Sequence, residues 1–154
     1  MKTTKFLARL VLGAALIFAG ISHLTFSRET FQAQVPTWLP LDADFVVLAS
    51  GVVEITLGIA LTSLGRHKAV VGIATALFFI AIFPGNISQY LTHSDAFGLN
   101  TDEARLIRLF FQPLLVLWAL WSTGGWAYLK RIITFASVIS VKGMVISRST
   151  SFFP

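Results

Sequence analysis

The chain has 154 residues, of which 55% are hydrophobic and 12% charged, and its formal net charge is +5. Soluble domains carry about 25% charged residues, so this chain has too few charges to cover a water-facing surface. It contains no cysteine, which excludes a disulfide framework, a thiolate nucleophile and an iron–sulfur cluster.

Four apolar segments approach the roughly 20 residues that a helix needs to cross a bilayer. They are residues 6–24, residues 45–64, a third segment that begins at residue 69, and residues 106–129. The third reaches full length only if it includes PGNISQYL. The first has a basic start, as a cleaved signal peptide does, but an arginine interrupts it and three further spans follow. We expect a retained helix, and an all-α, polytopic transmembrane four-helix bundle over residues 1–131.

The distribution of basic residues predicts the orientation of this bundle. Lysine and arginine lie in the amino-terminal segment, in the GRHK loop between the second and third spans, and after the fourth span, whereas the other two loops are acidic. Because basic loops remain in the cytoplasm, we expect a multi-pass membrane protein with both termini cytoplasmic. The basic residues flank apolar segments instead of forming one polar arm, so no nucleic-acid binding is expected.

The connecting segments carry helix-breaking and capping signals. The two prolines of QVPTWLP disfavour helix in the first loop. Asn100 is expected to cap the fourth helix together with Glu103, three residues later. Trp118, Trp121, Trp126 and Tyr128 are expected at the far end of that helix as an interfacial aromatic belt. Residues 132–154 form an atypical tail that is interfacial, a partial fifth helix or poorly ordered.

Glu54 is the clearest ionisable residue within an apolar segment. At about 1.5 Å per residue from the start of its helix, it lies near the middle of the bilayer. Gly51, Gly58, Thr62 and Gly65 recur with it at spacings of three and four, on the kind of small-residue face that packs against other helices. Because ionisable residues inside a membrane are costly, Glu54 is expected to point into the bundle.

Other polar residues converge on the outer half of the predicted bundle, above Glu54. They come mainly from the third and fourth helices, and the first contributes one: His23, Asn86, Gln89, Arg105, Arg108 and Gln112. Pro84 and Pro113 lie among them, and each frees the backbone carbonyl four residues earlier. Such freed carbonyls are tolerated in a membrane where a polar partner or a cavity satisfies them. We therefore predict a pocket formed by Glu54, His23, Asn86, Arg108 and Gln112.

A pocket with a buried carboxyl, arginine donors and aromatic walls suits a quinone or a similar amphipathic molecule. Quinone carbonyls accept hydrogen bonds, and their reduction requires protons, so Glu54 is either a proton donor or merely the partner of an arginine. The alternative is that these polar residues only tie the helices together. His23, His67 and His93 show no ligand spacing, so neither a metal site nor a haem is expected, and no cofactor other than a quinone is indicated.

Four sequence segments, in the order in which they occur, support the prediction of a membrane bundle with a polar pocket. FAGISHLTFSRETFQAQVPTWLP, SGVVEITLGIAL, FPGNISQYL and RLFFQPLLVLWALW together resemble the DoxX-like family of bacterial membrane proteins. The resemblance covers about residues 10–128 and implies a four-helix membrane bundle. Related members include a small subunit of thiosulfate:quinone oxidoreductase, and most have no established activity. The recurrent family positions fall here on Gly20, His23, Phe31, Pro36, Pro40, Gly51, Glu54, Gly58, Pro84, Asn86, Arg108, Gln112 and Pro113.

The leading hypothesis is a DoxX-like subunit or accessory of a quinone-linked redox system, with oxidoreductase subunits encoded elsewhere. A second hypothesis is a small-solute or proton-coupled transporter, which would need a homodimer because four helices are few. A third is a structural partner protein without its own activity. Whether the chain is an enzyme is left open by the sequence.

Overall fold

The computed structural model describes residues 2–96 and 98–150, with side chains up to residue 137. All regular secondary structure in the described residues is helical, and they contain no strand. Its elements are α1 (Lys2–Leu24), α2 (Arg28–Gln32), α3 (Ala43–Ser63), the 3-10 turn η1 (Gly65–His67), α4 (Lys68–Leu91), α5 (Asp102–Thr123) and α6 (Gly125–Thr150). The predicted all-α four-helix bundle is confirmed.

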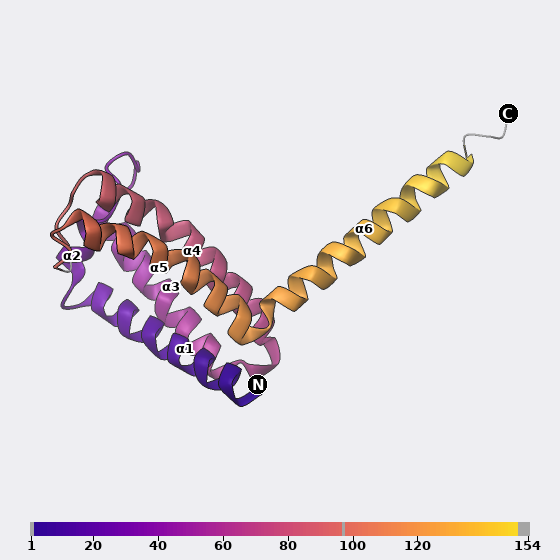
Figure 1. Cartoon of the computed structure of the whole chain (residues 1–154), viewed down its shortest axis with the longest axis horizontal. Helices are drawn as coiled ribbons and strands as arrows, with labels where there is room; N and C mark the ends of the chain where they lie inside the picture. The colour runs from indigo at the N-terminus through magenta and orange to yellow at the C-terminus, as the bar shows by residue number, and fades with distance from the viewer. Residues whose placement is uncertain (1, 97, 151–154) are drawn as a thin grey trace.

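Helices α1, α3, α4 and α5 run side by side and form the bundle (Figure 1). Each is long and apolar enough to cross a membrane, so the chain is a membrane protein with four candidate transmembrane helices. Helix α4 continues through Pro84 to Leu91, as the third span required. The first three predicted spans agree with α1, α3 and α4 to within a few residues.

The bundle consists of two closely packed helix pairs, α1 with α3 and α4 with α5. Glycines bring the backbones of the first pair together: Gly13 faces Gly58, and Gly20 faces Gly51. This arrangement confirms that Glu54 shares its face with small residues, since Gly51, Glu54 and Gly58 are all buried. The predicted fourth small residue, Gly65, lies outside α3 in the 3-10 turn.

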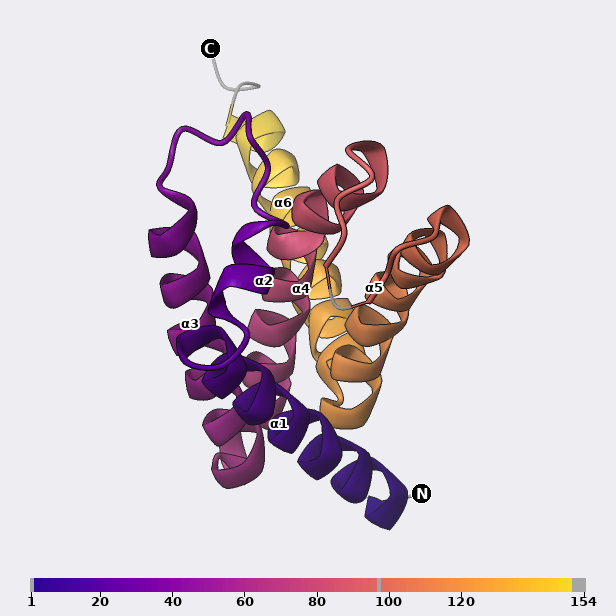
Figure 2. The same cartoon turned by 90° about the vertical axis from the view of Figure 1, so that its left-hand side faces the viewer.

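The segment between α1 and α3 closes one end of the bundle, and Figure 2 shows it looping from α2 back to α3. Arg28 and Gln32 of α2 both bond to the Asp44 carboxylate at the start of α3. The hydrogen bond with Asp44 raises the pKa of the Arg28 guanidinium, and the contacts of Arg28 and Gln32 with Asp44 hold α2 against α3. The sequence did not predict α2.

Two local predictions about the fourth span are wrong. The N-cap of α5 is Thr101 and not Asn100, because the Thr101 hydroxyl accepts the Ala104 amide hydrogen at 3.2 Å. The helix ends at Thr123, where Gly124 adopts a left-handed conformation with φ of 78°, a backbone geometry that glycine adopts without strain. The aromatic belt is therefore divided, with Trp126 and Tyr128 on α6.

Helix α6 leaves the bundle at the end where α1 begins and extends away from it (Figure 1). The tail was expected to be interfacial, a partial fifth helix or poorly ordered, and the structure has a helix that continues to Thr150. It begins at Gly125, so the expected division between residues 131 and 132 falls inside this helix. Residues 151–154 lie outside the described part of the chain.

Candidate functional site

A cavity of about 670 Å³ opens between the two helix pairs in the half of the bundle nearer to α2. This volume is within the range of small-molecule sites. Apolar side chains from all four long helices form most of its walls, with Phe31, Val35 and Trp38 contributed by the first loop region. All five residues predicted to form a pocket line this one cavity: His23, Glu54, Asn86, Arg108 and Gln112.

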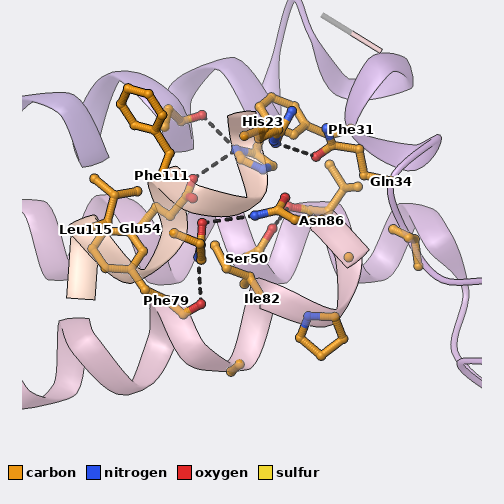
Figure 3. Close-up of a pocket in the computed structure, with 18 of the residues that line it drawn as sticks. His23, Phe31, Gln34, Ser50, Glu54, Phe79, Ile82, Asn86, Phe111 and Leu115 are labelled. Atoms are coloured by element: carbon orange, nitrogen blue, oxygen red, sulfur yellow. Dashed lines mark hydrogen bonds and ion pairs between the residues drawn. The ribbon is translucent and has the colours of Figure 1, made fainter. Parts of the chain in front are cut away.

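His23 and Glu54 lie in contact with each other in the buried part of the cavity (Figure 3). The His23 Nδ1 atom lies 2.9 Å from the Glu54 Oε2 atom, and both side chains are more than nine-tenths buried. The α1–α3 glycine contacts explain this proximity, because Gly20 and Gly51 lie one turn from His23 and Glu54 on the touching faces. The partner of Glu54 is thus a histidine, and not the arginine considered from the sequence.

The position of the His23 ring is fixed by two further contacts. Its Nδ1 atom lies 2.8 Å from the Ala19 carbonyl oxygen, which can only accept a hydrogen bond, so Nδ1 carries the proton. The ring stacks on Phe31, with centroids 3.4 Å apart and planes inclined by 20°. Since the Nδ1 hydrogen points to Ala19, the Glu54 Oε2 atom receives no hydrogen bond from the described residues. Glu54 therefore retains an acceptor position for a ligand or a proton.

Asn86 and Gln112 connect α4 with α5 along one wall of the cavity. The Asn86 amide donates to Gln112 Oε1 at 3.0 Å, and Gln112 Nε2 donates to the Phe79 carbonyl oxygen at 2.6 Å (Figure 3). The sequence suggested that Pro84 frees the Ile80 carbonyl, but the carbonyl that receives a side-chain donor is Phe79, one residue earlier. Both amides are buried, and this chain of bonds holds them in a single orientation.

Gln34 is the main polar residue of the site that sequence reasoning missed. Its Oε1 atom accepts from Arg108 Nη2 at 2.9 Å, and its Nε2 atom donates to Gln89 Oε1 at 3.0 Å. Gln34 thereby fastens the first loop to both α4 and α5 above the cavity. The sequence offers little signal for it, because a glutamine in a loop has no periodic neighbours that indicate which way it faces.

We predict that Gln34→Leu removes both contacts and frees the loop from the bundle. Loss of the two bonds leaves Gln89, which is 1% exposed, without its side-chain partner, and should cost about 1–3 kcal/mol in unfolding free energy. Denaturation in detergent micelles measures this difference. Glu29→Gln, on exposed α2 surface, is the control and should leave stability within about 0.5 kcal/mol. Equal stability of Gln34→Leu and the unmodified chain would contradict the assigned role.

Two of the predicted outer residues, Gln89 and Arg105, do not line the cavity. Gln89 bonds to Gln34, and Arg105 has partners elsewhere. Arg105 is buried and pairs with Asp95 and with Asp102, and Asp102 also contacts His93 Nδ1 at 2.7 Å. These contacts tie the α4–α5 loop to the start of α5. At the end of the cavity away from α2, Leu12, Leu16 and Phe79 line the cavity and also belong to the hydrophobic core of the bundle. These three residues form an apolar floor that closes the site below Glu54.

Comparison with known families gives one match. Residues 12–123 match the model of a domain of unknown function, DUF8561. The chain belongs to this family. The DUF8561 match ends at the last residue of α5 and spans nearly all of the four-helix bundle, including every residue that lines the cavity, whereas α6 falls outside it. No curated protein and no solved structure matches the chain.

Proposed function

We propose that the protein binds a quinone, or a similar amphipathic ring compound, as a DoxX-like subunit or accessory of a membrane redox system. The observation that carries this proposal is the composition of the cavity. Its walls are predominantly apolar, yet a buried histidine–carboxylate pair, an arginine and two oriented amides converge on it. Such a mixture of apolar walls and a few convergent polar groups is typical of ligand sites.

The residues fit the two ends of such a ligand. The Arg108 guanidinium is a hydrogen-bond donor that suits a ring carbonyl, and Phe31 extends the stacking surface beside His23. A protonated His23 ring would add a second donor at Nε2, because Nδ1 already bonds to the Ala19 carbonyl. Apolar residues such as Ile82, Phe111 and Leu115 suit an isoprenoid tail. Reduction of a quinone takes up two electrons and two protons. The electrons would come from an oxidoreductase subunit encoded elsewhere, while His23 with Glu54 would hold a proton at the site.

The proposed setting is the bacterial inner membrane with both termini in the cytoplasm. The structure supports this orientation through the separation of charge along the bundle. Lys2, Lys5, Arg66 and Lys68 belong to one end, and the loops at the other end contain Asp42 and other acidic residues. The positive-inside rule assigns the basic end to the cytoplasm. The cavity then lies in the outer half of the bilayer.

Proton-coupled transport of a small solute is the alternative, favoured by the buried Glu54 in a membrane-spanning helix. The apolar floor argues against it, because a permeating solute would have to pass between Leu12, Leu16 and Phe79. A flux assay in proteoliposomes separates the two functions. Proton-dependent uptake that Glu54→Gln abolishes would establish transport, whereas quinone binding without uptake supports the redox function.

Filling the cavity tests the proposal directly. Ser50 lines it, and its hydroxyl donates to the carbonyl of Val47 on its own helix. Since this bond lies within α3, Ser50→Trp should occupy the space and keep the fold. We expect it to lower the amount of quinone that co-purifies with the chain, and its affinity for decylubiquinone, at least about tenfold. Val52→Trp is the matched control, because Val52 is on the same helix and 55% exposed. Equal binding by both variants would refute a quinone site here.

A further inference from the structure

A second polar site lies at the opposite end of the bundle, around Arg9. The Arg9 residue is 5% exposed, and its Nε and Nη1 atoms form no hydrogen bond with any described residue. The Phe6 ring lies beside it, with its centroid 5.5 Å from the Arg9 Cζ atom. Because a guanidinium is not deprotonated in proteins, Arg9 is a buried cation that needs an anionic partner.

The chain itself offers no carboxylate side chain for Arg9. All seven acidic residues belong to the middle of α3 or to the end of the bundle that carries α2: Glu29, Asp42, Asp44, Glu54, Asp95, Asp102 and Glu103. The end where α1 begins is instead uniformly basic and is called the basic end below: Lys2, Lys5, Arg9, Arg66, Lys68, Lys130 and Arg131. The counter-anion must therefore come from outside the chain.

An apolar groove lies at the same end of the bundle as Arg9, on a side where Leu114, Leu117 and Trp121 are exposed. It has a volume of about 430 Å³ and runs between α1 and α5, lined by Ala8, Leu114, Leu117, Trp118 and Trp121. Trp118 Nε1 donates to the Ala8 carbonyl oxygen at 3.1 Å and so fixes one wall. Lys5, one turn before Arg9, places its Nζ atom 5.7 Å from the Trp121 ring centroid. Lys5 therefore lies at the groove, and Arg9 directly follows the groove residue Ala8 in α1.

We propose that this groove and Arg9 form a binding site for an anionic phospholipid of the leaflet at the basic end. The headgroup phosphate would pair with Arg9 and Lys5, since a guanidinium donates two hydrogen bonds in a geometry that matches phosphate oxygens. An acyl chain would lie in the groove against Trp118 and Trp121. The apolar groove distinguishes a lipid from free phosphate, which would have no use for it.

Quenching by brominated lipids tests this site in the full chain. In a Trp38→Phe and Trp126→Phe background, fluorescence comes only from Trp118 and Trp121. We expect brominated phosphatidylglycerol to quench it at roughly fivefold lower membrane content than brominated phosphatidylcholine. Equal quenching by the two lipids would overturn the proposal. Loss of the preference on adding millimolar inorganic phosphate alone, at constant ionic strength, would show a free-anion site and also overturn it.

Two variants separate Arg9 from the general positive charge of the basic end. Arg9→Gln should abolish the preference for phosphatidylglycerol, whereas Arg131→Gln, which removes an exposed charge at the same end, should retain it. In detergent without anionic lipid, Arg9→Gln should melt at the same temperature as the unmodified chain or higher, because it removes a buried unpaired charge. Added phosphatidylglycerol should raise the melting temperature of the unmodified chain only. An equal rise in both would overturn the role of Arg9.

Discussion

Gly20→Ala is expected to destabilise the bundle by at least about 2–3 kcal/mol, the upper part of the range for overpacked cores. An added Cβ atom at Gly20 would lie 2.5 Å from the Gly51 carbonyl oxygen and 3.0 Å from the Ile55 backbone nitrogen. Both atoms belong to the backbone of α3, so no rotamer change relieves the overlap. The two helices must separate, and His23 then moves away from Glu54 because both lie on the separating faces.

The matched control is Gly65→Ala, where the nearest atom to an added Cβ lies 4.0 Å away. Gly65 is in the 3-10 turn outside the helix contact, so this variant should unfold at nearly the same denaturant concentration as the unmodified chain. Unfolding of both variants in mixed micelles measures the difference. If Gly20→Ala were as stable as Gly65→Ala, the close contact between α1 and α3 would be wrong.

The sequence predicted the fold well because the bilayer imposes a length and a polarity on each span. Segments of about 20 apolar residues can satisfy their backbone groups in lipid only as helices. Helix ends were less predictable, as Asn100 and Thr101 show. Both residue types cap helices, and only the backbone conformation selects Thr101, whose φ and ψ of −122° and 150° direct its hydroxyl to Ala104.

The candidate site was predictable in its members but not in its pairings. Glu54, His23, Asn86 and Gln112 stood out because polar residues in apolar segments are costly and must face inward. Their partners depend on helix rotation and on distances within an ångström, which no spacing in the sequence records. Arg108 was equally available to Glu54 by topology, yet its guanidinium donates to the loop residue Gln34.

Glu54→Gln is expected to lower proton-coupled quinone reduction by roughly 100-fold, the contribution typical of a general acid or base, while changing stability little. This expectation rests on the proposed function. The effect on stability should be small because His23 keeps two contacts when the carboxylate is replaced. These are its bond to the Ala19 carbonyl and its stacking on Phe31. The imidazole can then remain neutral and satisfied.

His23→Leu, in contrast to Glu54→Gln, should also lower the stability of the fold. It leaves the Glu54 carboxylate buried without its ion-pair partner, and breaking a buried pair in this manner costs about 3–5 kcal/mol. Unfolding free energies of the two single variants and the double variant measure the coupling between the residues. The cost of His23→Leu should fall when Glu54→Gln is also present, because no charge is then left unpaired.

The rate is measured as quinone-reductase activity of membranes that carry each variant in place of the native chain. Glu29→Gln is the control, since it removes an exposed carboxylate outside the cavity and should leave the rate unchanged. A Glu54→Gln protein with normal activity and reduced stability would make the His23–Glu54 pair a device for packing α1 against α3. A stable Glu54→Gln protein with lost activity would separate the chemistry of the carboxylate from the fold, because the glycines hold the two helices together without it.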